Sequence, residues 1–255
     1  MSHTPRSSAL LLATFATLVA CGAPAGPEAD ARFAQQRDAL VRSIERHVQD
    51  TRDYLGRAEL SARTIAALET TPRHEFVPES LRRYAYDDRP LPIGHDQTIS
   101  QPYIVAIMTD LLDLQPGCRV LDIGTGSGYQ AAVLAEMCEH VYTIEIVEPL
   151  GVAARERLAR LGYDNVTVRI GDGFDGWPDE APFDGIVVAA VADELPPPLL
   201  EQLRPGGRII MPVGDPMGYQ ELILGERRAD GSLAETRVLP VRFVPLTRDP
   251  DRQNP

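Results

Sequence analysis

One glycine-rich run constrains the fold of this chain more than any other feature. The run Leu121–Gln130 (LDIGTGSGYQ) follows an apolar stretch typical of a strand and precedes a stretch typical of a helix. Its glycines stand at alternate positions, Gly124, Gly126 and Gly128. A tight turn there can bring bare backbone N–H groups against a ligand that a Cβ would exclude. The run therefore predicts a strand, a ligand-binding turn and a helix, although such a turn alone can also be a purely structural connection.

Two carboxylates strengthen the prediction of a nucleoside site. Asp122 lies just before the turn, and Glu145 ends the next apolar run, where a nucleotide-binding βαβ unit has its ribose-binding acid. The dinucleotide fingerprint requires a third glycine at the position that Tyr129 occupies. Alternate glycines with a preceding acid are instead typical of S-adenosylmethionine-dependent methyltransferases, so we expect S-adenosyl-L-methionine as the cofactor.

Strand-like and helical runs alternate from residue 101 onward. The strand-like runs are RVLDI (119–123), HVYTIEI (140–146), VTVRI (166–170), GIVVAAV (185–191) and RIIMPV (208–213). This alternation predicts an α/β fold with a doubly wound, mainly parallel sheet of the class I S-adenosylmethionine-dependent methyltransferase type. ELILGER (221–227) and VLPVRFVPL (238–246), joined by a loop with Asp230 and Gly231, predict an antiparallel C-terminal hairpin that closes the sheet.

The N-terminal part has a different character. Apolar residues at helical spacing predict an amphipathic helix over 33–48, and a second helix over 61–68 begins with Ser61 as its cap. Prolines then punctuate residues 72–102, which should wrap around the sheet without joining it. We divide the chain into a leader and linker (1–31), a methyltransferase domain (32–248, with a wrapping segment 32–100 and a core 101–248) and a tail (249–255).

Charge and cysteine content exclude several classes of function. A net charge of −12 provides no basic footprint for nucleic acid, so a peptide or small-molecule acceptor is expected. Cys118 and Cys138 lack the spacing and the neighbouring histidines of a metal site, so we expect no metal. We interpret them as two buried or half-buried thiols without a disulfide.

The leader raises the question of compartment. An apolar run from Ala9 to Ala20 is too short to span a bilayer and precedes Cys21, a pattern typical of a bacterial lipoprotein signal. Lipidation of Cys21 would anchor an exported protein to a membrane, whereas an upstream extension with a chance cysteine would not. The cytoplasmic supply of S-adenosylmethionine favours a cytoplasmic enzyme, so both alternatives stay open.

A further carboxylate follows the third strand. Asp172 lies between Gly171 and Gly173 in RIGDGFDGW, just past the predicted strand end. Ligands of doubly wound sheets bind beyond the carboxyl ends of the strands, so this loop should approach the glycine turn. An Asp-Gly pair alone is commonly an ordinary turn. The position of this one favours contacts of Asp172 and Gly173 with the adenine.

The order of these motifs over residues 33–247 resembles the protein-L-isoaspartate O-methyltransferase family. QTISQP (97–102) and VRFVPLT (241–247) are the most specific segments. The resemblance implies methylation of isoaspartyl residues in damaged proteins and peptides, with Ser100 as the active-site residue. It also suggests Thr98, Ile99 and Thr247 as substrate contacts, and we expect a monomer that binds no nucleic acid. Methyltransfer to a small molecule, or a non-catalytic exported binding protein, are the alternatives.

Ser100 has a structural interpretation as well. A serine before Gln101, Pro102 and an apolar-periodic run is a typical helix N-cap. The two roles are compatible, because a helix N-terminus offers free N–H groups to a carboxylate. An acceptor carboxylate with a pKa of about 4 is ionised at neutral pH, so the reaction needs no general base. We therefore assign Ser100 to positioning the acceptor.

Overall fold

The computed structural model describes Met1 and residues 27–249. The predicted signal, Cys21 and the tail beyond Asp249 lie outside the described residues. The first helix, α1 (Pro27–Asp50), begins within the stretch that the sequence assigned to leader and linker. Its apolar residues Leu40, Val41, Ile44 and Val48 are buried, which confirms the predicted amphipathic helix.

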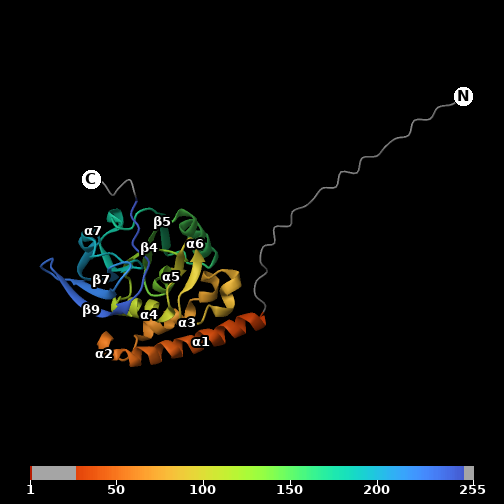
Figure 1. Ribbon diagram of the computed structural model, residues 1–255, viewed down its shortest axis with the longest axis horizontal. Helices are drawn as coiled ribbons and strands as arrows, with labels where there is room; N and C mark the ends of the chain where they lie inside the picture. Colours follow the sequence, from red (N-terminus) through yellow and green to blue (C-terminus); the bar gives the residue numbers. More distant parts are fainter. Residues whose placement is uncertain (2–26, 250–255) are drawn as a thin grey trace.

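The described residues form one seven-stranded sheet with the order β5-β4-β3-β6-β7-β8-β9 (Figure 1). Neighbouring strands from β5 to β7 are parallel, whereas β8 runs antiparallel to both β7 and β9. The strands are β3 (Arg119–Ile123), β4 (His140–Glu145), β5 (Val166–Ile170), β6 (Phe183–Val188), β7 (Leu203–Gly214), β8 (Gln220–Arg227) and β9 (Leu233–Val241). The predicted doubly wound, mainly parallel sheet with an antiparallel C-terminal end is confirmed.

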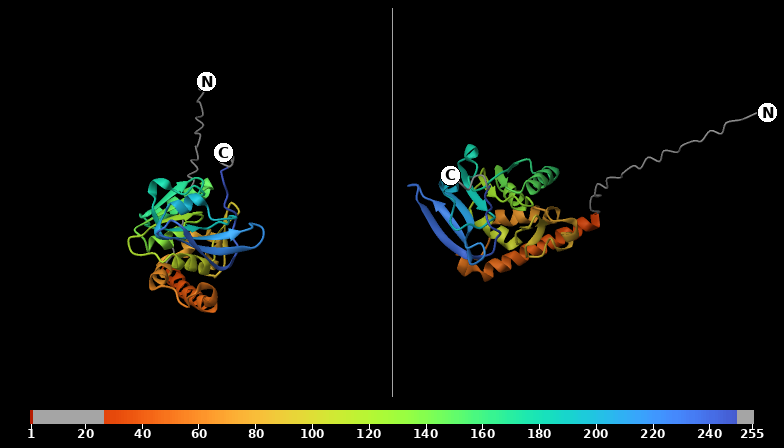
Figure 2. Two further views of the ribbon diagram at one scale, coloured as in Figure 1. Left: turned by 90° about the vertical axis from the view of Figure 1, so that its left-hand side faces the viewer. Right: turned by 45° about the horizontal axis from the view of Figure 1, so that its top comes forward.

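Apolar residues on both faces of the strands explain why helices cover the sheet. Successive residues Val120 and Leu121 of β3 are both fully buried, and they belong to different hydrophobic clusters. The helices α4 (Pro102–Leu111), α5 (Tyr129–Ala135) and α6 (Glu148–Arg160) contribute to the first cluster, and α7 (Pro197–Glu201) to the second. The long helix α1 lies outside α3 (Ala62–Thr70) and α4 as a further layer (Figure 2).

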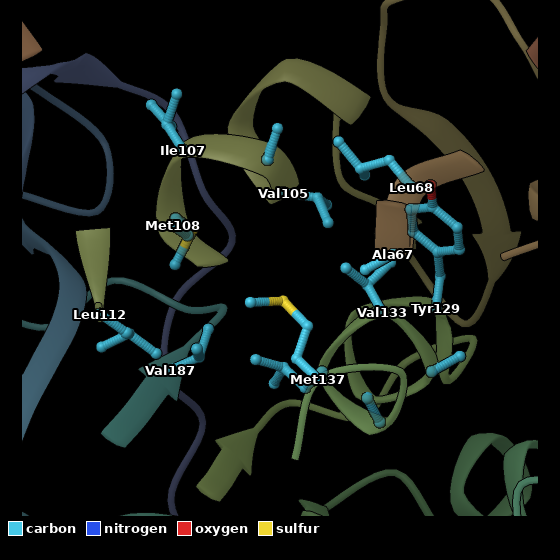
Figure 3. Packing of buried hydrophobic residues seen from close by; sticks show 14 of the residues in the cluster. Ala67, Leu68, Val105, Ile107, Met108, Leu112, Tyr129, Val133, Met137 and Val187 are labelled. Carbon is cyan, nitrogen blue, oxygen red and sulfur yellow. The ribbon is translucent and has the colours of Figure 1, made fainter. Parts of the chain in front are cut away.

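The larger cluster joins the N-terminal helices to the sheet. Figure 3 shows Ala67 and Leu68 of α3, Met108 of α4 and Val133 of α5 converging on it. Burial of such side chains contributes about 25 cal/mol per Å² of apolar surface. The N-terminal region is therefore part of the same packed unit as the sheet.

The wrapping segment stays separate from the large sheet, as predicted. Its short strands β1 (Leu91–Gly94) and β2 (Gln97–Ile99) pair only with each other. The remaining short elements in the described part of the chain are α2 (Arg52–Leu55) and the 3₁₀ helices η1 (Arg73–Phe76), η2 (Glu79–Tyr84) and η3 (Pro178–Glu180). The Ser61 side chain accepts a hydrogen bond from the Thr64 N–H, which confirms it as the cap of α3.

Three predictions about local structure are wrong. Helix α4 has Gln101, not Ser100, as its N-cap, because Pro102 fixes the first helical position. The last strand ends at Val241, since the Phe243 N–H binds the Gln220 side-chain oxygen (2.6 Å) and the chain leaves the sheet. Cys118 and Cys138 form a disulfide. Cys118 directly precedes β3 and Cys138 follows α5, and the fold brings their Cα atoms to 4.7 Å.

Within the described residues, none of the helices combines the length and apolarity needed to cross a membrane.

Candidate active site

A cavity of about 640 Å³ opens at the carboxyl ends of β3, β4 and β6. The strand order reverses between β3 and β6, because β4 and β5 follow on one side and β7 on the other. Ligands of doubly wound folds usually bind beyond the strand ends at such a reversal. Eight predicted site residues line the cavity: Thr98, Ile99, Ser100, Gly124, Gly126, Glu145, Gly173 and Thr247. The structure thus brings together segments that lie up to about 150 residues apart in the chain.

The glycine turn forms one wall of the cavity. The Gly124 and Thr125 N–H groups both donate to the Ile144 carbonyl at the end of β4 (2.9 and 3.2 Å). Gly126 has a φ of 52°, a left-handed conformation that a residue with a Cβ rarely adopts. Gly128 is the N-cap of α5, and a Cβ there would lie 3.2 Å from Leu158. Gly128 does not line the cavity in this structure, and it packs against Leu158.

Asp122 lies beneath the turn and does not line the cavity. Its side chain is fully buried, and its Oδ2 accepts a hydrogen bond from the Thr143 hydroxyl (2.8 Å). Its Oδ1 has no partner among the described residues. Burial raises the pKa of Asp122 to about 7, and the Thr143 hydrogen bond opposes this shift. The geometry gives Asp122 a supporting place under the turn.

Glu145 connects the turn to the end of β4. Its Oε2 accepts from the Gly126 N–H (2.7 Å), and its Oε1 accepts from the Val147 N–H (2.9 Å). The residue is 5% exposed and lines the cavity. Each carboxylate oxygen has a further lone pair, so the same group can also accept hydrogen bonds from two hydroxyls of a ligand.

The loop after β5 separates the two residues that the sequence paired. Gly173 lines the cavity, whereas the Asp172 side chain turns away and pairs with the Arg248 guanidinium (2.9 Å). Asp172 also accepts from the Phe174 N–H (2.9 Å). Burial opposes ionisation of Asp172, but these hydrogen bonds and the charge of Arg248 hold its pKa below the usual value. Its Oδ1 accepts only the Phe174 hydrogen bond among the described residues, so it has a further lone pair.

The wrapping segment forms a second wall of the same cavity. Thr98 and Ile99 end the small strand β2, and Ser100 follows immediately. Ser100 is half-buried, and its carbonyl accepts a hydrogen bond from the Arg73 guanidinium (2.8 Å). The predicted N-cap role is wrong, but the residue still precedes α4 and lines the cavity.

The segment after β9 closes the third side of the cavity. Its backbone crosses to the end of β6, where the Val191 N–H donates to the Val244 carbonyl and the Leu246 N–H donates to the Val191 carbonyl. In Figure 1 this is the blue segment that leads from β9 to the C-terminus. Residues 240–247 all line the cavity, of which the sequence had singled out Thr247 alone.

Sequence reasoning missed several other lining residues. They include Ser127, Gln130, Ala189, Ala190 and Arg242. Ala189 and Ala190 follow β6 directly, so the rule that ligands lie beyond strand ends could have indicated them. Glu145 and Arg242 are the charged residues among those that line the cavity. The cavity is therefore mostly apolar and uncharged, with one acid at the turn and one exposed cation at its edge.

Comparison with known proteins identifies the family. The family model for protein-L-isoaspartate(D-aspartate) O-methyltransferase matches residues 49–251. The chain is 52% identical over 242 residues to protein-L-isoaspartate O-methyltransferase 2 of Syntrophobacter fumaroxidans, covering 95% of this chain and 98% of that protein. It is 59% identical over 191 residues to protein-L-isoaspartate O-methyltransferase 1 of Nitrosospira multiformis, covering 75% of this chain and 81% of the relative.

Solved structures agree with this assignment. A protein-L-isoaspartate O-methyltransferase structure matches with a TM-score of 0.71 and 30% identity, covering 83% of this chain and 66% of that one. The corresponding protein of Plasmodium falciparum, in complex with S-adenosyl-L-homocysteine, matches with a TM-score of 0.69 and 25% identity over 83% of this chain and 98% of that one. Sequence, fold and the position of the cavity together show that this chain belongs to the protein-L-isoaspartate O-methyltransferase family.

Proposed function

We propose that this protein transfers the methyl group of S-adenosyl-L-methionine to the free α-carboxylate of isoaspartyl residues in damaged proteins and peptides. Family membership supports the reaction, since the relatives carry the name of this activity. The observation that carries the proposal is that the glycine turn and the wrapping segment that ends in Ser100 line the same cavity. A donor and an acceptor bound side by side in one cavity are held for direct transfer.

The residues of the first wall fit the donor. A nucleoside needs a close approach to backbone and a carboxylate for its ribose hydroxyls, and the walls offer Gly124, Gly126 and Glu145 for this. Gly173 would lie against the adenine, and the adjacent Asp172 would accept a hydrogen bond from the adenine amino group. Asp122 and Gly128 would hold the turn in shape from below. When bound, S-adenosylmethionine supplies an electrophilic methyl group.

The residues of the second wall would handle the acceptor. The isoaspartyl α-carboxylate is already ionised at neutral pH, so the protein has to orient it and exclude water, with no proton to remove. We propose that the Ser100 hydroxyl donates a hydrogen bond to this carboxylate. Thr98, Ile99 and Thr247 would contact the peptide around it. The neighbouring backbone nitrogen then attacks the methyl ester, which forms a succinimide and releases methanol. Hydrolysis of the succinimide returns part of the damaged residues to normal peptide bonds.

A pair of peptide isomers tests the proposed function. We expect methyl incorporation from labelled S-adenosylmethionine into an isoaspartyl peptide and none above background into the same peptide with a normal aspartyl residue. The assay uses the full chain, because the N-terminal helices pack in the same hydrophobic cluster as the sheet. Equal incorporation into both isomers, or none into either, would contradict the proposal and favour a small-molecule acceptor.

The compartment has two proposed alternatives. The supply of S-adenosylmethionine favours the cytoplasm, whereas the predicted lipoprotein signal would export the enzyme and anchor it through Cys21. The disulfide between Cys118 and Cys138 supports export, because the cytosol keeps most thiols reduced. Fractionation and lipid labelling of the wild type and of Cys21→Ser decide between them. Labelling that depends on Cys21 would establish the anchored form, and unlabelled protein in the cytosolic fraction would exclude it.

We also propose that residues 32–248 act as a monomeric methyltransferase domain. Light scattering of the purified protein should give the mass of a single chain, and a dimeric mass would contradict the proposal.

A further inference from the structure

The most unusual charged group outside the cavity lining is Arg73. It lies in the 3₁₀ helix η1 of the wrapping segment, and it is fully buried with 0% exposure. Arginine is almost never fully buried unless its charge is paired, because removing a guanidinium from water is costly. A buried arginine therefore requires an explanation in terms of its partners.

The partners of Arg73 are neutral carbonyl groups and an aromatic ring. Its Nε donates to the Ala85 carbonyl (2.9 Å), and its Nη2 donates to the Ser100 carbonyl (2.8 Å). The guanidinium carbon lies 4.8 Å from the centre of the Tyr129 ring. Tyr129 is the first residue of α5, directly after the glycine turn. Ser100, at the end of the wrapping segment, and Tyr129 both line the cavity. Arg73 thus contacts both walls from behind.

Within residues 27–249, no carboxylate forms an ion pair with Arg73, and its Nη1 has no hydrogen-bond partner. Burial lowers the pKa of the Arg73 guanidinium to about 10, so it is still protonated at neutral pH. Asp88 is the acid whose charge acts on it, but the Asp88 carboxylate accepts instead from the Tyr103 N–H (2.9 Å) and contacts His47 (3.3 Å). The positive charge behind the cavity wall therefore has the charge of Asp88 near it but no carboxylate in direct contact.

We propose that Arg73 is a positioning residue that makes the acceptor end of the cavity electropositive and fixes Ser100 there, so that the site selects an anionic acceptor. The inference rests on the proposed function and deepens it. In a site shielded from water, an unpaired cation favours an anion much more than the same cation would at the surface. Arg73 acts through Ser100 and Tyr129, and the cost of burying its charge is offset when the isoaspartyl carboxylate enters the cavity.

Two other arginines show what distinguishes Arg73. Arg63 also donates to two backbone carbonyls, those of Leu114 and Met137, but it is not a cavity residue. Arg242 lines the cavity, but it is exposed, so water and salt screen its charge. Substitution of Arg63 is therefore the matched control. It removes hydrogen bonds to two carbonyls, as substitution of Arg73 does, but it does not change the electrostatic potential in the cavity.

The test compares two peptides that differ in charge alone. One has an isoaspartyl residue, and the other has the same residue with its α-carboxylate replaced by a carboxamide. Their binding is measured calorimetrically with S-adenosyl-L-homocysteine present, and the ratio of the two affinities reports the preference for the anion. We expect Arg73→Gln to reduce this ratio about tenfold. Arg63→Gln should lower the melting temperature but leave the ratio unchanged.

A lysine variant gives an independent result even where Arg73→Gln fails to fold. In Arg73→Lys, burial lowers the pKa of the amine, so the preference for the carboxylate should fall as the pH rises from about 5 to 9. The wild type should stay nearly constant, because its guanidinium remains charged. Two tyrosines, Tyr86 and Tyr129, lie next to residue 73, and burial raises the pKa of both. Asp88, His74 and Glu75 are also nearby, and the same titration of the wild type serves as the control for any effect of these groups.

The outcomes separate this inference from the proposed function. An unchanged ratio in Arg73→Gln, or a pH-independent ratio in Arg73→Lys that equals that of the wild type, would overturn the role of Arg73. Loss of the discrimination between isoaspartyl and aspartyl peptides by the wild type itself would instead overturn the proposed function.

Discussion

Substitution of Gly173 by alanine tests the shape of the donor side of the cavity. A Cβ at this position would overlap the Cγ2 methyl of Ile123 and lie 3.5 and 3.6 Å from its Cδ1 and Cβ atoms. Ile123 is 2% exposed and also lines the cavity, so it has little room to move except into the ligand space. Such overpacking typically costs about 1–3 kcal/mol. Gly173→Ala should therefore weaken both the fold and the binding of the donor.

The size of the expected changes in stability and donor affinity follows from the overlap with Ile123. A loss of about 1–3 kcal/mol lowers the melting temperature by about 2–4 °C per kcal/mol in a chain of this size. Displacement of Ile123 into the cavity should raise the Kd for S-adenosyl-L-homocysteine about tenfold, equivalent to about 1.4 kcal/mol. Calorimetric titration gives the Kd, and thermal denaturation gives the stability.

The matched control is Gly171→Ala in the same loop. A Cβ on Gly171 meets nothing within 4 Å, and its backbone N–H still donates to the Glu145 carbonyl. The control should retain the affinity and the melting temperature of the wild type. Equal behaviour of the two variants, or wild-type affinity in Gly173→Ala, would refute the assignment of this loop to the donor.

Three further predictions concern the acceptor, the disulfide and the buried acid. Ser100→Ala should lower methyl transfer while S-adenosyl-L-homocysteine binding is retained, and the reverse pattern would reject its proposed role. The Cys118–Cys138 disulfide closes a loop with a sequence separation of 20, so its reduction should lower the free energy of unfolding by about 3 kcal/mol. Denaturant titrations with and without reductant measure this difference, and equal midpoints would contradict it. Because burial raises the pKa of Asp122 from 3.8 to about 7, its neutral form stabilises the fold fully below about pH 4, and this contribution is lost as the pH rises to about 7. The stability of Asp122→Asn relative to the wild type should therefore increase between about pH 4 and 7 and level off above, whereas a pH-independent difference would show that Asp122 does not titrate in this range.

The parallel core was predictable because its signals are local. The strands β3 and β5 coincide with the predicted runs RVLDI and VTVRI, since buried parallel strands appear as short apolar runs between turn residues. The glycine turn and Glu145 also lie in the cavity, because the order of strand, turn and helix fixes which strand ends meet. The position of the site thus followed from the sequence.

The parts that could not be predicted depend on contacts between distant segments. The disulfide requires that the start of β3 meets the chain just after α5, and a spacing of 20 residues gives no sign of this. The ion pair between Asp172 and Arg248 depends on where the chain runs after β9. The burial of Arg73 is equally invisible in the sequence, because the wrapping segment has no periodic pattern that would place it behind Ser100.

The central claim is that one cavity holds the methyl donor on the glycine turn and the acceptor carboxylate at Ser100. A crystal structure of the protein with S-adenosyl-L-homocysteine and an isoaspartyl peptide tests it most directly. We expect the sulfur beside Gly124 and Gly126, with the isoaspartyl carboxylate facing it and within hydrogen-bond distance of the Ser100 hydroxyl. A carboxylate bound elsewhere, with Ser100 on the far side of the fold from the sulfur, would show that the two groups do not share this cavity.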